Sequence, residues 1–236
     1  MVNYYSLLKL GLFKLIFYYH YINCKLLKMH TKFLQNFSLK SKHLIFIICV
    51  SLILRLFFLI FYEGLNTELK EDPLNYFQIA EYAVNNGILN WQSHTRPPLL
   101  SLIIIPFLKI FPEFLTLISI KIFMILISIL NCVIIYILSF EISKKNKISL
   151  ISSLVFSFYP YSIFMSGKLL TENLTSLLIS LICLFLIKFF KNKKIKYLII
   201  FSFLLGLLSL TRSSFYYLPF FFIILFFLNK TTFIKK

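Results

Sequence analysis

The chain has 236 residues, of which 59% are hydrophobic and only 14% are charged, and its formal net charge is +17. A soluble domain carries about 45–50% apolar and about 25% charged residues, so this composition excludes a water-soluble globular protein. Most lysines lie in short clusters between apolar blocks, where they would meet lipid headgroups, so the charge favours a membrane over nucleic acid as the partner.

The first 43 residues are basic and amphipathic. Their apolar start is interrupted by Lys9, Lys14 and His20, and no small-residue cleavage pattern precedes the next basic run. We therefore expect residues 1–43 to be a cytoplasmic or interfacial segment, and residues 44–236 to form a transmembrane domain.

Residues 44–62 form the first block long enough to cross a bilayer, because about 20 helical residues span about 30 Å of hydrocarbon. Arg55 lies inside this block, where a cation is costly unless it is paired or reaches the headgroups. Glu63 or Glu68 could pair with it, and we expect a structural role for Arg55.

The segment after this span concentrates acidic residues. Five of the eight acidic residues of the chain lie between Glu63 and Glu81. Because membrane proteins place irregular, charged backbone where it lines a cavity or meets water, we expect the chemistry to lie in an external loop, residues 63–98.

Within this loop, Asp72-Pro73 followed by LNYFQIAEYAVNNG predicts a short helix. Asp72 would be its N-cap, Pro73 its first residue and Gly87 its end. Tyr76 and the alanines at helical spacing would give it an apolar face against the membrane surface. Asp72 is then either a simple cap or a reactive carboxylate, and both interpretations stay open.

Arg96 precedes two prolines that lead into a short apolar block, residues 99–111. The prolines stiffen the start of this block, so we expect Arg96 to point back toward the loop. Its guanidinium suits phosphate oxygens, and extension to lipid headgroups is the alternative. The block carries Pro106 and Lys109 and is too short to cross, which predicts a re-entrant or interfacial helix.

Five further spans are expected in the remaining sequence. Blocks 114–140, 148–165 and 172–190 have the length of one helix each, whereas the last stretch, 197–228, is too long for one. Arg212 and its hydroxyl neighbours interrupt that stretch, so we expect two helices that turn there. The fold class is therefore all-α, a polytopic membrane bundle of about six transmembrane helices with two shorter helices in the external loop.

The basic clusters orient this bundle, because Lys and Arg are enriched on the cytoplasmic side of membrane proteins. The clusters lie at residues 25–42, 144–147, 191–196 and 230–236. Six spans place all four clusters on one side, with both termini cytoplasmic. A full crossing by residues 99–111 would move the later clusters to the other side.

Three more charged residues fall on the external side in this topology. Glu172 opens a span, so it either contacts the helix N-terminus or supplies a second acid to a cavity. Lys168 could reach a headgroup or a bound phosphate. Arg212 lies between two helices on the loop side, which favours an anionic partner. The histidines and cysteines lack metal-ligand spacing, and no glycine-rich phosphate loop is present.

Taken in order, these features resemble the N-terminal half of integral-membrane glycosyltransferases of the C superfamily. This group contains the protein O-mannosyltransferases and the aminoarabinose transferase of lipid A. The matching pieces are Arg55 in the first span, Asp72-x-x-x-Tyr76-x-x-x-Ala80, Arg96-Pro97-Pro98-Leu99-Leu100, residues 166–172, and Gly206-Leu207-x-x-Leu210-Thr211-Arg212.

The resemblance implies transfer of a sugar from a polyprenyl-phosphate donor to a hydroxyl of a glycan, lipid or protein at the external face. By position, Asp72 resembles the catalytic base of the family, and Arg96 resembles the basic residue that contacts the lipid phosphate. Glu71 completes an acidic pair like that of the O-mannosyltransferases but in reversed order, so which carboxylate acts stays open. Arg212 or Lys168 would assist Arg96, and a single displacement would invert the anomeric carbon.

The same resemblance leads us to expect no cofactor and no obligatory metal, although Asp72 with Glu172 could hold a divalent ion. Relatives usually have more spans, so we expect a chain that lacks the usual C-terminal part, as a truncated enzyme or as a subunit that needs a partner. The alternative is a non-catalytic membrane subunit, or a protein that binds or transports lipid-linked sugars. The AT-rich codon bias and the absence of a cleavable leader favour a bacterial inner membrane.

Overall fold

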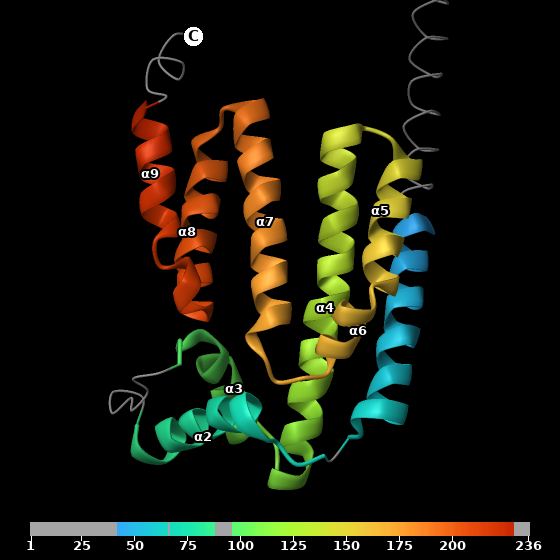
Figure 1. The fold of residues 1–236 in the computed structure, drawn as a ribbon, viewed down its shortest axis with the longest axis vertical. Helices are drawn as coiled ribbons and strands as arrows, with labels where there is room; N and C mark the ends of the chain where they lie inside the picture. Colours follow the sequence, from blue (N-terminus) through green and yellow to red (C-terminus); the bar gives the residue numbers. More distant parts are fainter. Residues whose placement is uncertain (1–41, 66, 88–95, 229–236) are drawn as a thin grey trace, which may run out of the picture. The chain divides into compact units, whose positions relative to one another are not determined.

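The computed structural model describes residues 42–65, 67–87 and 96–228 (Figure 1). The chain divides into two compact units, Met1–Ile45 and Phe46–Lys236, and the architecture below is that of the second. Every regular element in the described residues is a helix, which confirms the all-α class. The expected basic segment 1–43 lies outside the described residues, except for its last two.

The first described helix, Lys42–Glu63, confirms the expected span 44–62. Its last turn widens into a π-helix, η1 (Leu59–Glu63), and the Gly64 N–H donates to Leu59 O at 2.8 Å. Gly64 has a φ of 76°, which a residue without a Cβ adopts readily, so the chain can leave the helix sharply.

Arg55 is fully buried within this helix, and the expected pairing with Glu63 or Glu68 is wrong. Its guanidinium donates to Ser51 O at 3.3 Å, Ser128 Oγ at 2.8 Å, Cys132 Sγ at 3.4 Å and Ser162 Oγ at 3.1 Å. Neutral oxygen and sulfur atoms therefore surround the cation, because Glu63 is the last residue of the helix, eight positions after Arg55, and Glu68 lies beyond it. These bonds join the first helix to its neighbours, as a structural role requires.

Helices α2 (Glu71–Asn86) and α3 (Leu99–Ile110) pack against each other. Ser101 Oγ donates to Tyr76 O at 3.0 Å, and small buried residues of α2 allow the close approach. The helix ends at Gly87 as expected, but Asp72 is not its N-cap. That position is taken by Lys70, which leaves Asp72 second in the helix.

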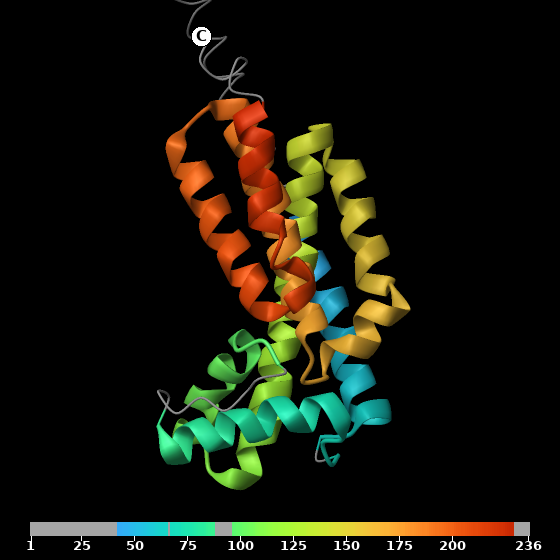
Figure 2. The same cartoon turned by 60° about the vertical axis from the view of Figure 1, so that its left-hand side comes forward.

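The short helix expected at residues 99–111 is observed as α3. Its 12 residues span about 18 Å, well short of the hydrocarbon thickness. Figures 1 and 2 show α2 and α3 beside one end of the longer helix α4 (Glu113–Ser143). The two short helices therefore lie together at one end of the bundle.

Two long apolar helices, α4 and α7 (Thr171–Asn192), confirm the spans expected at 114–140 and 172–190. They pack along each other, and Asn131 Nδ2 donates to Ser176 Oγ at 2.7 Å between them. At 31 residues α4 is about 46 Å long, so it extends beyond the hydrocarbon of a bilayer.

The block at residues 148–165, expected as one span, is not a single helix. This block forms two helices, α5 (Asn146–Phe158) and α6 (Pro160–Ser166), which meet at an angle of 60°. Tyr159 between them is extended, with a ψ of 116°. Proline disfavours the helical conformation in the residue before it, so Pro160 accounts for the bend.

The predicted break near Arg212 is confirmed. Helix α8 (Ile195–Thr211) ends there, Arg212 is extended, and the 3₁₀ turn η3 (Ser213–Phe215) leads to α9 (Leu218–Leu228). Among the described residues three helices are long and apolar enough to cross a membrane, or four if α5 and α6 form one broken span. Because α8 and α9 are shorter, the count of six spans stays a prediction.

The described basic turns lie at the end of the bundle away from α2 and α3 (Figure 1). Lys191 Nζ lies 3.5 Å from Glu141 Oε2, so the turn after α7 adjoins the end of α4. The clusters at residues 144–147 and 191–196 therefore share one side, as the expected topology requires.

Candidate active site

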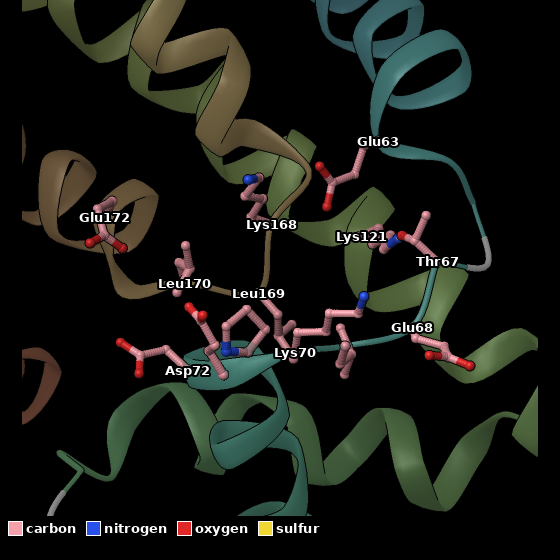
Figure 3. Close-up of a pocket in the computed structure, with 13 residues that line it drawn as sticks. Glu63, Thr67, Glu68, Lys70, Asp72, Lys121, Lys168, Leu169, Leu170 and Glu172 are labelled. Carbon is pink, nitrogen blue, oxygen red and sulfur yellow. The ribbon is translucent and has the colours of Figure 1, made fainter.

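A cavity of about 470 Å³ opens where the first loop meets the bundle (Figure 3). The segment before α2, the start of α2, one residue of α4 and the turn between α6 and α7 form its wall. Charged side chains predominate in this wall. The carboxylates are Glu63, Glu68, Glu71, Asp72 and Glu172, and the ammonium groups are Lys70, Lys121 and Lys168.

Asp72 and Arg96 form an ion pair between Asp72 Oδ1 and Arg96 Nη2. Asp72 lies in the first turn of α2 and Arg96 lies just before α3, so the packing of these helices brings the charges together. The Arg96 guanidinium also lies 5.9 Å from the centre of the Tyr76 ring. Asp72 keeps 47% of its side chain exposed, which leaves the carboxylate accessible from the cavity.

A second pair joins Glu172 to Arg212, with 3.6 Å between Glu172 Oε1 and Arg212 Nη1. Glu172 is in the first turn of α7 and Arg212 follows α8, and these two helices pack against each other. The other carboxylate oxygen of Glu172 is buried and has no hydrogen-bond partner within the described part of the chain. This arrangement leaves the carboxylate with unused acceptor capacity.

Tyr76 links the two pairs. Its ring is buried, its hydroxyl hydrogen-bonds to Thr171 at the start of α7, and Arg96 lies beside it. Burial raises the pKa of the Tyr76 phenol above its usual value, with the nearby Arg96 charge opposing the shift. The phenol is therefore neutral near pH 7 and can act as a donor or an acceptor.

Lys168 lines the cavity from the turn between α6 and α7. Its ammonium lies 3.6 Å from the centre of the Phe164 ring, a cation–π contact. A Cβ on the preceding residue, Gly167, would lie 3.2 Å from Leu59 Cδ1. The turn that carries Lys168 therefore packs closely against the first helix.

The structure thus places Glu71, Asp72, Lys168 and Glu172 in one cavity wall. Arg96 and Arg212 do not line the cavity, and each contacts one of its carboxylates. Tyr76 lies behind the wall and does not line it. In the described residues no group of three or more His, Cys, Asp or Glu side chains could hold a metal ion.

Lys121 is the main site residue that the sequence reasoning missed. It is 1% exposed on α4, and its ammonium donates to Gly64 O at 2.8 Å and to Thr67 Oγ1 at 2.7 Å. The signal was a lysine inside the apolar block 114–140, because charged residues within membrane segments face a bundle interior or a cavity.

Comparison with known families assigns the chain to one family. The family model for dolichyl-phosphate-mannose-protein mannosyltransferase matches residues 95–236, which is more than half of the sequence. The chain belongs to this family. Its membership confirms the resemblance to the C superfamily and makes the protein a membrane glycosyltransferase. No curated protein and no solved structure matches the chain.

The mannosyltransferase match covers part of the candidate site. Arg96, Lys168, Glu172 and Arg212 lie inside the matched residues, whereas Asp72 precedes them. The geometry joins the two parts, because Asp72 is ion-paired with Arg96.

Proposed function

We propose that this membrane glycosyltransferase moves a sugar from a polyprenyl-phosphate donor to an acceptor hydroxyl, with inversion at the anomeric carbon. The observation that supports the proposal is the charged cavity beside α2, where Asp72 is accessible and Arg96 contacts it. The family fits the same reaction class.

Asp72 is the base in this proposal. The acceptor oxygen attacks the anomeric carbon, its proton passes to the Asp72 carboxylate, and the bond from that carbon to the phosphate oxygen breaks. A positioned base of this kind typically contributes about 10²–10⁴-fold to the rate. Glu71 lines the same cavity, but the ion pair with Arg96 is formed by Asp72, which favours Asp72.

The cations act on the other half of the reaction. The departing lipid phosphate gains negative charge, and guanidinium groups stabilise such charge through paired hydrogen bonds. Arg96 would exchange its bond with Asp72 for one with the phosphate, which leaves the carboxylate ready to accept a proton. Lys168 on the cavity wall and Arg212 beside Glu172 would add to the stabilisation.

The charge distribution supports an external site. The basic turns at residues 144–147 and 191–196 lie at the end of the bundle opposite α2 and α3 (Figure 1). Because basic turns favour the cytoplasm, the cavity would face the other side of a bacterial inner membrane. The partners would be the lipid-linked donor and a glycan, lipid or protein that bears the acceptor hydroxyl.

The test compares Asp72→Asn with Glu71→Gln in purified protein supplied with a radiolabelled polyprenyl-phosphate sugar. We expect Asp72→Asn to lower the transfer rate by about 10²–10⁴-fold, and Glu71→Gln to have a smaller effect. Glu81→Gln is the matched control, because Glu81 is exposed on the same helix and does not line the cavity.

Other outcomes would assign the roles differently. A large loss in Glu71→Gln alone would move the base to Glu71. Transfer that survives in both variants, at unchanged expression and elution volume, would contradict an acidic base in this loop. A wild-type protein that binds the donor without transferring its sugar would support the non-catalytic alternative.

A further inference from the structure

Lys121 is a cation in the middle of an apolar helix that the proposed reaction does not use. A buried ammonium is costly unless oxygen atoms replace its water. Two of its three N–H groups have partners in the first loop, Gly64 O at 2.8 Å and Thr67 Oγ1 at 2.7 Å. Glu63 adds an electrostatic attraction. Figure 3 shows the ammonium beside the Thr67 hydroxyl.

The two partners, Gly64 and Thr67, lie on either side of the turn that follows the first helix. Thr67 Oγ1 also donates to Gly64 O at 3.4 Å, and a Cβ on Gly64 would lie 2.9 Å from Thr67 Cγ2. Gly64 and Thr67 therefore lie close together. Their carbonyl and hydroxyl oxygens face the ammonium on α4, so one side chain holds both ends of the turn.

This turn determines where the acidic part of the loop begins. Four residues after Thr67 the chain reaches Glu71, which has a φ of 53°, and Asp72 follows in the first turn of α2. So short a connection allows little independent movement between the turn and Asp72. A contact that holds the turn against α4 therefore limits the movement of the Asp72 carboxylate.

We propose that Lys121 is a positioning residue, which holds Gly64 and Thr67 against α4 and thereby fixes Asp72 in the cavity. The proposal rests on the proposed function only for its effect on sugar transfer. The tether itself is a property of the fold and can be measured without any substrate.

The first experiment measures the tether alone. A lysine-specific protease acts on the detergent-purified protein, and mass spectrometry follows cleavage after Lys70, which is exposed. We expect Lys121→Met to speed this cleavage at least fivefold, and Lys121→Arg, which keeps both donors, to restore most of the protection. Lys109→Met is the control, because Lys109 is an exposed lysine on α3.

Thr67→Val provides a second variant that leaves every charge in place. It removes the hydroxyl that Lys121 contacts, so we expect faster cleavage after Lys70 than in the wild type. If Lys121→Met does not fold, Thr67→Val alone decides the result. Unchanged cleavage in the variants that fold would overturn the tether, whatever the transfer assay shows.

The second experiment separates positioning from direct binding of the donor phosphate. A positioning role predicts that Thr67→Val and Lys121→Met both lower kcat, by about 3-fold or more, with little change in the donor KM. A Lys121 that binds phosphate predicts a raised donor KM in Lys121→Met and normal kinetics in Thr67→Val, which would overturn the proposal. Failure of Asp72→Asn to impair transfer would refute the proposed base and leave the cleavage result standing.

Discussion

The pair Glu172–Arg212 allows a quantitative test of whether an arginine acts on the ligand or only on its neighbouring acid. The two charged groups are 3.6 Å apart, with 49% of the Arg212 side chain and 25% of the Glu172 side chain exposed. Coulomb's law at an effective dielectric constant of about 20 gives an attraction of about 5 kcal/mol. Exposure, side-chain entropy and salt reduce the net value of such pairs to about 0.2–1 kcal/mol.

This small net value sets the expectation for Arg212→Gln. The free energy of unfolding should fall by less than about 1 kcal/mol, because the pair is partly exposed. The transfer rate should fall at least about tenfold, equivalent to about 1.4 kcal/mol, because a cation that stabilises the departing phosphate is lost. A rate effect of that size exceeds what the pair itself can supply.

The assay is a double-mutant cycle with Glu172→Gln, in which transfer rates and thermal unfolding are measured for all four proteins in detergent. We expect Arg212→Gln to slow transfer in the Glu172→Gln background as well, because its target is the phosphate. Lys196→Gln, an exposed site in the first turn of α8 and so at the other end of that helix from Arg212, controls for the change in net charge. If the Arg212→Gln effect disappears in the Glu172→Gln background, the arginine acts only through Glu172 and the reasoning is wrong.

Three further outcomes are expected. Burial raises the pKa of Tyr76 above the usual value of about 10. The neutral phenol therefore contributes its full stability below pH 10, and this contribution is lost as pH rises through the pKa of the folded protein. Above pH 10, the unfolding temperature of Tyr76→Phe should therefore fall less steeply with pH than that of the wild type. Arg55→Lys should lower the free energy of unfolding by about 1–3 kcal/mol, because an ammonium cannot serve the four partners of the guanidinium, and denaturant titration measures this loss. Gly64→Ala should cost about 1–3 kcal/mol in the same titration, from its positive φ and the 2.9 Å approach to Thr67.

The spans were predictable because length and hydropathy are properties of single segments. Blocks 114–140 and 172–190 became α4 and α7, and the charge at Arg212 marked the end of α8. Hydropathy does not predict the direction that a helix takes after a bend. The apolar composition of the block 148–165 predicted one helix, whereas the bend before Pro160 divides it into α5 and α6.

The exact start of α2 was also beyond sequence reasoning. Asp72 and Pro73 are good residues for the N-cap and first position of a helix, yet the helix begins two residues before Pro73, at Glu71. Local signals locate a helix end only to within a residue or two, because the packing of the whole helix decides the remainder. That packing here involves α3, which follows later in the chain.

The sequence predicted which charged residues belong to the site, but it did not predict which groups they contact. Arg96 and Arg212 were expected near phosphate, but each contacts a carboxylate. Asp72 and Arg96 are 24 positions apart, so their meeting depends on how α2 packs on α3. Lys121 shows the same limit, because its oxygen partners lie more than 50 positions earlier.

The two contacts near Asp72 have different consequences during the proposed reaction. Arg96 holds the carboxylate directly, and binding of a lipid phosphate would draw the guanidinium away from it. Lys121 acts on the turn before Asp72, and its two hydrogen bonds do not involve the carboxylate. The direct contact can therefore be lost when the donor binds while the indirect one persists. The base must stay in place while it accepts a proton. If the Arg96 ion pair alone held Asp72, the loss of that pair on donor binding would free the carboxylate to react and also release it from its position. The Lys121 contact keeps the position when the ion pair is lost.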